Sequence, residues 1–263
     1  VLAPGRKKTK TGRIWTYVRD DRNAGSSDPP AAWFAYSPDR QGKHPELHLR
    51  SFRGVLQADA FAGYDRLFST SREGGVLTEA ACWAHARRKI HDVYISSQSA
   101  TAEEALKRIG ELYAIEAEIR GMPETERLAA RQSRSAPLLA SLHEWMVEKS
   151  ATLSKKSRLG EAFTYALNQW DALCYYCRDG LAEPDNNAAE RALRAVCLGK
   201  KNYIFFGSDH GGERGALLYG LIGTCRLNGI DPEAYLRHIL SVLPEWPSNR
   251  VGELLPWNVA IPA

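Results

Sequence analysis

Residues 99–180 have the pattern of consecutive amphipathic helices, and they interrupt a chain whose earlier part has the pattern of strands. Residues 13–20 and 31–36 are rich in β-branched and aromatic side chains, and residues 55–58 and 76–83 are short apolar runs. Strands and helices that share one core are typical of a layered α/β fold. The pattern therefore predicts an α/β fold with a mainly helical insertion.

Inside the insertion, Thr101 and Glu104 have the spacing of a capping box, and Gly121 is placed to end the first helix. Further helices are expected after Pro137 and over residues 159–177. The insertion carries charges of both signs. This favours a packing subdomain over the alternative, a platform for DNA or for a second protomer.

Outside the insertion, the same criteria predict a strand at residues 203–206 and helices at residues 46–53, 84–90, 188–194, 213–222 and 231–243. We expect residues 1–98 and 181–226 to form the two parts of one core, around the insertion at 99–180. Residues 227–263 are expected to add a C-terminal helix and a strap.

Two carboxylates stand at positions where chemistry and capping are both plausible roles. Asp59 follows the apolar run 55–58, and the carboxyl end of a strand is where α/β folds place reactive groups. It could equally cap the next helix. If Asn187 is an N-cap, Glu190 has the spacing of a capping box, and spacing alone favours that structural role.

The basic residues are unevenly distributed. Residues 1–50 hold ten Lys or Arg against five Asp or Glu, and residues 186–226 hold six against three. Such segments suit a polyanionic partner, because neutralised phosphates release counterions. The glycine-rich run at residues 207–215 could hold a phosphate at a helix start or could be a tight turn.

Cysteine spacing leaves a metal site open but does not favour one. Cys82 and His85, together with Cys174 and Cys177, could in principle make a four-ligand zinc site. The second pair lies in a helical pattern, where buried cysteines usually behave as small apolar residues. Five cysteines in a chain of this length suggest a reducing, cytosolic setting.

Several motifs in one order resemble the insertion-sequence-66 family of bacterial transposases. They include GVLQADAFAGYDRLF (54–68), CWAHARRKI (82–90), DNNAAERALR (185–194) and GKKNYIFFGSDHGGERGA (199–216). The resemblance implies a ribonuclease-H-like core and a DDE-type carboxylate triad for DNA cleavage and strand transfer. It identifies Asp59 as the second catalytic carboxylate and Glu190 as the third. By the same resemblance, Asp59 would ligate both of two Mg²⁺ or Mn²⁺ ions and Glu190 one of them, since such ions prefer oxygen ligands.

The resemblance also implies the partners of the chain. These are DNA, as element ends and target, a homo-oligomer assembled on that DNA, and accessory proteins of the same element. His85 and Asn187 are expected to support the active site. The residues expected to hold the DNA backbone are Arg87, Arg88, Lys89, Arg191, Arg194, Lys200, Lys201 and Arg214.

No run of 18 apolar residues is present, so we expect no membrane span and a bacterial cytoplasmic, nucleoid-associated location. The family's first catalytic aspartate precedes the VLAPG segment with which this chain begins. We therefore expect a fragment with little catalysis of its own and an unpaired strand edge. The alternatives are a non-catalytic DNA-binding or interaction remnant and, less favoured, a standalone nuclease of the same fold.

Overall fold

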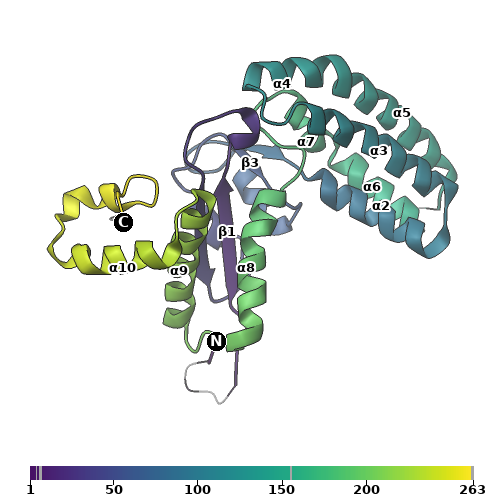
Figure 1. Cartoon of the computed structure of the whole chain (residues 1–263). Helices are drawn as coiled ribbons and strands as arrows, with labels where there is room; N and C mark the ends of the chain where they lie inside the picture. The colour runs from purple at the N-terminus through teal and green to yellow at the C-terminus, as the bar shows by residue number, and fades with distance from the viewer. Residues whose placement is uncertain (4, 6–7, 155, 262–263) are drawn as a thin grey trace. The chain divides into compact units, whose positions relative to one another are not determined.

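The computed structural model describes residues 1–3, 5, 8–154 and 156–261 (Figure 1). The chain forms two compact units. Unit 1 comprises Val1–Asp20, Ser27–His48 and Ala188–Ala263, and unit 2 comprises Asp21–Ser26 and Leu49–Asn187. The fold is mixed α/β with two small sheets, one in each unit, which confirms the predicted class at this level.

The sheet of unit 1 is an antiparallel pair made of β1 (Arg13–Arg19) and β2 (Ala31–Ser37). Tyr17 lies opposite Trp33 in this register, and their rings stack with centroids 5.1 Å apart. Both strands confirm the predictions for residues 13–20 and 31–36. Their β-branched and aromatic side chains pack across the strands, which stabilises such a pair.

Helix α9 (Asp209–Leu227) packs on β2 because it presents small residues to the strand. Gly212, Ala216 and Gly220 recur every four residues, so they share one face of the helix. The hydroxyl of Thr224, one turn further on, accepts from the Ala32 amide at 3.1 Å and lies 3.1 Å from the Ala32 carbonyl, to which it donates. The predicted helix at 213–222 is therefore correct in type but too short.

Helix α8 (Asn187–Tyr203) replaces two predicted elements, a short helix at 188–194 and a strand at 203–206. The strand prediction is wrong. Tyr203 ends the helix, and Ile204 follows with a left-handed φ of 66°. The Tyr203 hydroxyl lies 3.2 Å from that of Tyr219 on α9, and its ring lies 4.9 Å from that of Phe206. Aromatic packing on α9 outweighs the strand propensity of this run.

Unit 1 also contains α1 (Lys43–His48) and α10 (Pro232–Val242). The helix predicted at 46–53 thus begins three residues earlier, ends five residues earlier and is two residues shorter. The helix predicted at 231–243 is confirmed, and Asp231 caps it by accepting from the Glu233 and Ala234 amides. Two 3-10 segments follow, Leu243–Glu245 and Ser248–Leu254.

The sheet of unit 2 pairs β3 (Val55–Gln57) with β4 (Thr78–Ala80) in parallel. A 3-10 segment, Ala62–Phe68, lies between them in the chain. The predicted strand at 76–83 is shorter than expected, because α2 (Trp83–Ser97) already begins at Trp83.

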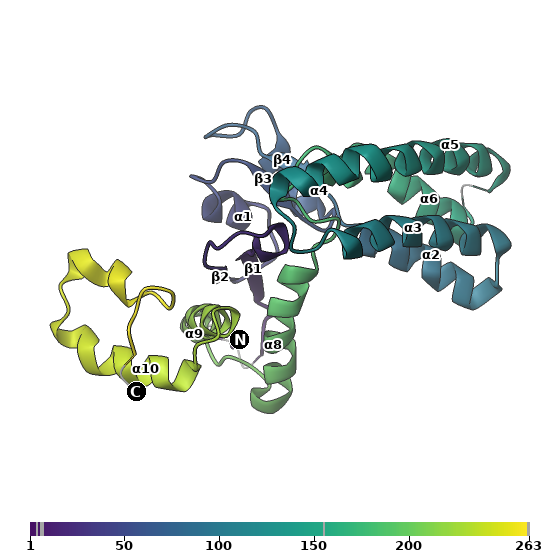
Figure 2. The same cartoon turned by 45° about the horizontal axis from the view of Figure 1, so that its top comes forward.

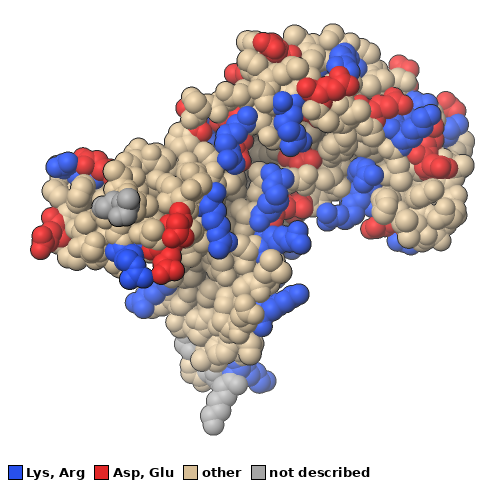
Figure 3. Space-filling view, in the orientation of Figure 1, with Lys and Arg blue, Asp and Glu red and all other residues tan. Residues whose placement is uncertain are grey.

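Four helices of unit 2 pack as a bundle (Figure 2): α2, α3 (Ala100–Glu118), α5 (Ala136–Thr152) and α6 (Arg158–Asn168). Apolar side chains from all four fill its core, among them Ile90, Ile109, Met146 and Phe163. Figure 3 shows acidic and basic side chains interspersed over these helices. The packing role favoured for the insertion stays a prediction.

Within the insertion, several local predictions need correction. Ser99, not Thr101, is the N-cap of α3, since its hydroxyl accepts from the Ala102 amide. Pro137 stands in the first turn of α5, where proline is tolerated, and α4 (Glu124–Ala130) with a π segment (Arg131–Ser135) runs directly into that helix. The stretch predicted as one helix at 159–177 divides into α6, α7 (Trp170–Leu173) and a 3-10 turn (Tyr175–Cys177).

Among the helices that the structure describes, none combines the length and the apolar character that crossing a membrane requires.

Candidate functional site

Asp59 lies just beyond the carboxyl end of β3, where the parallel pairing with β4 is extended by a hydrogen bond from the Ala58 amide to the Ala80 carbonyl (3.0 Å). Its side chain is exposed. Within the described residues the carboxylate makes no hydrogen bond or ion pair. The pKa of Tyr165 is raised, mainly by burial, then by the electrostatic effect of Cys82 and, third, by that of Asp59. Asp59 therefore offers oxygen atoms that no other described side chain engages through a hydrogen bond or an ion pair.

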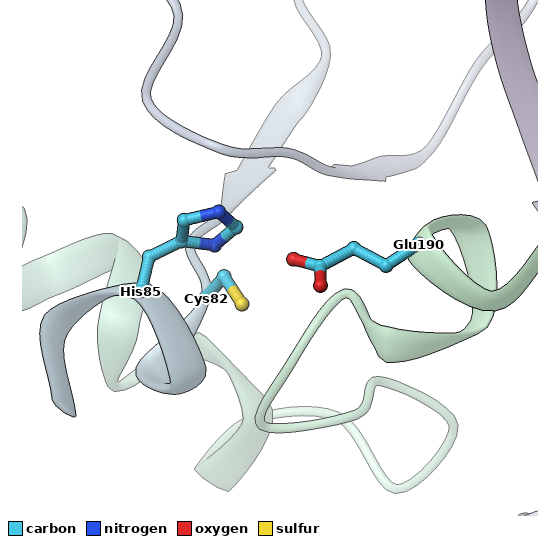
Figure 4. A group of neighbouring side chains, drawn as sticks. All are labelled: Cys82, His85 and Glu190. Carbon is cyan, nitrogen blue, oxygen red and sulfur yellow. The ribbon is translucent and has the colours of Figure 1, made fainter. Parts of the chain in front are cut away.

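Cys82 and His85 stand at the start of α2 (Figure 4). Cys82 is buried, and its Sγ accepts a hydrogen bond from the Asn186 amide at 3.2 Å. Burial raises the pKa of this thiol, so it is neutral at physiological pH. His85 is half-buried, in the first turn of the helix.

The four-ligand zinc site is not formed. Among the described residues, Cys174 and Cys177 do not join Cys82 and His85 in any group of candidate metal ligands. Burial raises the pKa of Cys174 to about 12 and that of Cys177 to about 11. Both thiols are thus neutral, in keeping with a packing role.

Glu190 is the fourth residue of α8 and is half-buried (Figure 4). The chain enters this helix through an Asx turn, in which Asp185 Oδ1 accepts from the Asn187 amide at 3.1 Å. Asn187 is the first residue of α8, so the side chain that accepts at this end belongs to Asp185. The sequence had offered Asn187 as a candidate N-cap, and the structure places it inside the helix.

Three of the four basic residues on α8 share one exposed face. Arg191, Arg194 and Lys201 are all exposed, and at 100° per residue they lie within about 80° of one another around the axis. They span about 15 Å along the helix. Lys200 is also exposed but points about 100° to 180° away from the other three.

The other basic candidates are exposed as well but are more scattered. Arg87, Arg88 and Lys89 are consecutive on α2, so they point in different directions, and Lys89 Nζ lies 4.7 Å from the centre of the Tyr165 ring. Arg214 lies on α9. A continuous basic face is thus found on α8 rather than on α2.

The glycine-rich turn before α9 is not a vacant phosphate site. Ser208 caps the helix by accepting from the Gly211 amide at 3.1 Å. Asp209, in the first turn, accepts from the Tyr36 hydroxyl at 2.6 Å and from Lys10 Nζ at 2.7 Å. A carboxylate already occupies this helix start, so the alternative of a tight turn is the better description.

Sequence reasoning missed two polar residues near these candidates. Gln57, in β3, donates through Nε2 to the Glu183 carbonyl at 2.6 Å, and the Glu183 carboxylate pairs with Arg127 of α4. The signal for Gln57 was present, since an amide in a short apolar strand needs a partner. Glu183 gave no comparable signal.

The comparisons with known proteins agree with these motifs. A family model described as "Transposase IS66 family" matches residues 1–214, and a second, "IS66 C-terminal element", matches residues 220–257. The protein y4hP of Sinorhizobium fredii is 42% identical over 96% of this chain and 48% of its own length. The protein y4jD of the same organism is 38% identical over 98% of this chain and 51% of its own length.

The chain therefore spans about half the length of the relatives it matches. No solved structure matches it.

Proposed function

Because this chain belongs to the IS66 family of transposases, we propose that it supplies two carboxylates, Asp59 and Glu190, of a DDE-type active site that cuts and joins DNA. The observation that carries the proposal is Asp59, an exposed carboxylate at the end of a parallel strand, within the region that the family model matches. We also propose that the core is ribonuclease-H-like, on the strength of the family alone.

The residues fit a divalent cation such as Mg²⁺ or Mn²⁺. Such ions prefer carboxylate oxygens, and the Asp59 carboxylate is exposed and not engaged by another described side chain. Glu190, half-buried at the start of α8, would be the second protein ligand. When bound, two ions would activate the attacking oxygen and stabilise the leaving oxygen of a phosphodiester.

The basic face of α8 would hold DNA against these carboxylates. Arg191, Arg194 and Lys201 lie on the helix that carries Glu190, so a backbone bound along this face would lie close to the third carboxylate. Phosphate contacts of this kind position a duplex without reading its sequence. The relative y4hP is about twice as long as this chain. We further propose that a protein of that length, which includes this chain, recognises the element ends and forms a homo-oligomer together with accessory proteins.

The test is metal-dependent cleavage of DNA that carries element ends, by a protein that includes this chain. Asp59→Ala and Glu190→Ala should each abolish cleavage while DNA binding is retained. Asp65→Ala is the matched control, since Asp65 is an exposed acid six residues from Asp59. Cleavage that survives either of the first two substitutions would contradict the proposal.

A second candidate, DNA binding without catalysis, is favoured by the exposed basic face of α8. In that case, binding should weaken steeply with salt, and neither Asp59→Ala nor removal of divalent metal should change it. No metal-dependent cleavage should then be found for the longer protein either.

A further inference from the structure

Unit 2 holds the backbone of residues 183–187, the segment that leads into α8. The Glu183 carbonyl accepts from Gln57 Nε2 at 2.6 Å, and the Pro184 carbonyl accepts from the Trp83 amide at 2.9 Å. Gln57 belongs to the strand that precedes Asp59, and Trp83 is the first residue of α2. The segment is thus fixed to the elements that carry the other site residues of unit 2.

The Glu183 side chain ties the same segment to the helical insertion. One carboxylate oxygen accepts from Arg127 Nη2 at 2.5 Å, and the other accepts from Asn23 Nδ2 at 3.2 Å. Arg127, on α4, is 1% exposed, whereas the Glu183 side chain is 25% exposed. The ion pair therefore joins a buried side chain of the insertion to a partly exposed side chain of the segment.

A second, buried carboxylate lies near Arg127. Arg127 Nη2 lies 3.6 Å from Glu116 of α3. Arg131 donates to both oxygens of the Glu116 carboxylate, through Nε at 2.8 Å and through Nη2 at 2.7 Å. Arg131 Nη1 also donates to the carbonyls of Tyr176 and Asp179. Arg127 is thus buried next to this network on the bundle side, and among the described residues Nη2 pairs with the carboxylates while Nε and Nη1 are buried without a hydrogen-bond partner.

We propose that Arg127 and Glu183 are positioning residues that set the start of α8 and, through it, the catalytic carboxylate Glu190. Glu190 is three residues beyond Asn187, so it lies within one helical turn of the held segment. A shift of the segment would be passed to Glu190, and a displacement of about 1 Å at a reacting group can cost on the order of 100-fold in rate. The inference rests on the proposed function for the role of Glu190, whereas the hold on the segment stands by itself.

A stabilising role alone is a weaker explanation. Replacing a buried ion pair by apolar residues of similar volume is often neutral for stability or even stabilising, because desolvation offsets the attraction. The ion pair between the insertion and this segment is better explained by a role in positioning the segment. Among the described residues, the exposed pair Arg134 and Glu118 makes no hydrogen bond or ion pair with the segment, so it offers a control.

The experiment compares three variants: Glu183→Ala, the double change Arg127→Leu with Glu183→Leu, and the control Glu118→Ala. The double variant leaves neither Arg127 nor Glu183 as an unpaired charge. It therefore separates the effect of losing the segment's position from the effect of losing folding stability. Hydrogen exchange of the peptide 183–190 is measured in this chain, below the unfolding temperature of each variant. Single-turnover cleavage and DNA affinity are measured in a protein that includes the chain.

We expect faster exchange of the 183–190 peptide in Glu183→Ala and in the double variant, with cleavage slowed about tenfold or more and DNA affinity within about twofold. Glu118→Ala should change neither. Wild-type exchange in the double variant, or fast exchange with undiminished cleavage, would overturn the inference. If the wild-type protein does not cleave, the proposed function fails, and the exchange data still decide whether Arg127 and Glu183 hold the segment.

Discussion

Protonation of Asp209 should lower the stability of unit 1. Hydrogen bonds from Lys10 and from the Tyr36 hydroxyl hold the pKa of this carboxyl below its ordinary value of 3.8. A lowered pKa in the folded state means that the charged form stabilises the fold above that ordinary value. This contribution is lost as the pH falls through the lower, folded-state pKa.

The prediction is that Asp209→Asn is less stable than the wild type at pH 7, and that the difference shrinks as the pH falls below the ordinary aspartate range. Urea unfolding of both proteins at pH 7 and at a pH below the ordinary aspartate range measures the difference in stability. Asp28→Asn is the control, because Asp28 pairs with Arg19 at an exposed position, where ion pairs contribute little. A stability difference between the wild type and Asp209→Asn that grows on acidification would be opposite to the expected change and would exclude this explanation.

At the scale of elements, the contact between α9 and β2 depends on the absence of a side chain. A Cβ at Gly212 would lie 2.4 Å from the ring of Tyr36, which its hydrogen bond to Asp209 holds in place. At Gly110 on α3, a Cβ would meet nothing within 4 Å. The two glycines therefore test packing against helix propensity.

We expect Gly212→Ala to destabilise the protein by about 1–3 kcal/mol, as overpacking does, although alanine is the better helix former. Gly110→Ala should stabilise it by about 0.5–1 kcal/mol, since only propensity changes there. Thermal or chemical unfolding of the two variants gives both values. Equal effects at the two sites would show that α9 and β2 are not in close contact.

The basic face of α8 leads to a prediction about salt dependence. Replacing Arg191, Arg194 or Lys201 by Gln should each lower the slope of log K against log salt by about one, if each neutralises one phosphate. Lys200→Gln should leave the slope unchanged, because Lys200 points to another side of the same helix. Fluorescence anisotropy with duplex DNA at several salt concentrations measures the slopes, and equal losses at all four positions would contradict a single binding face.

The elements that the sequence predicted well are those whose signals are local. Alternation marked the first strand of the unit 1 hairpin, aromatic residues marked the second, and the Asp231-Pro232 pair marked the start of α10. The strand prediction for residues 203–206 was wrong although the strand propensity of this run is real. Tyr203 contacts Tyr219 on α9, and no periodic pattern in the sequence reveals that contact. Tertiary packing overrides propensity at such a place.

In the candidate site, too, local features could be predicted from the sequence and long-range contacts could not. The position of Asp59 at a strand end could be read from the residues around it. The hold on residues 183–187 could not, since Gln57 and Glu183 are 126 positions apart. Such contacts are fixed only when the whole chain has folded.

At the scale of the molecule, the two units differ in the cores that hold them together. In unit 2, the bundle buries a continuous apolar cluster that draws on α2, α3, α5 and α6, and the buried Arg131 and Glu116 pair closes one end of it. The cluster between α8, α9 and the hairpin of unit 1 is much smaller, centred on Phe34, Val196 and Ala216. Since buried apolar area is the main favourable term in folding, unit 1 should be the less stable unit.

Hydrogen exchange at increasing urea concentration tests this difference. Peptides of β2 and α9 should lose protection at lower urea than peptides of α3 and α5, which gives two transitions. Because Glu190 belongs to unit 1 and Asp59 to unit 2, partial unfolding of unit 1 would remove one carboxylate while the other stayed in place. Cleavage by the longer protein should then be lost with the first transition and not the second. A single transition shared by all peptides would mean that the two units fold as one.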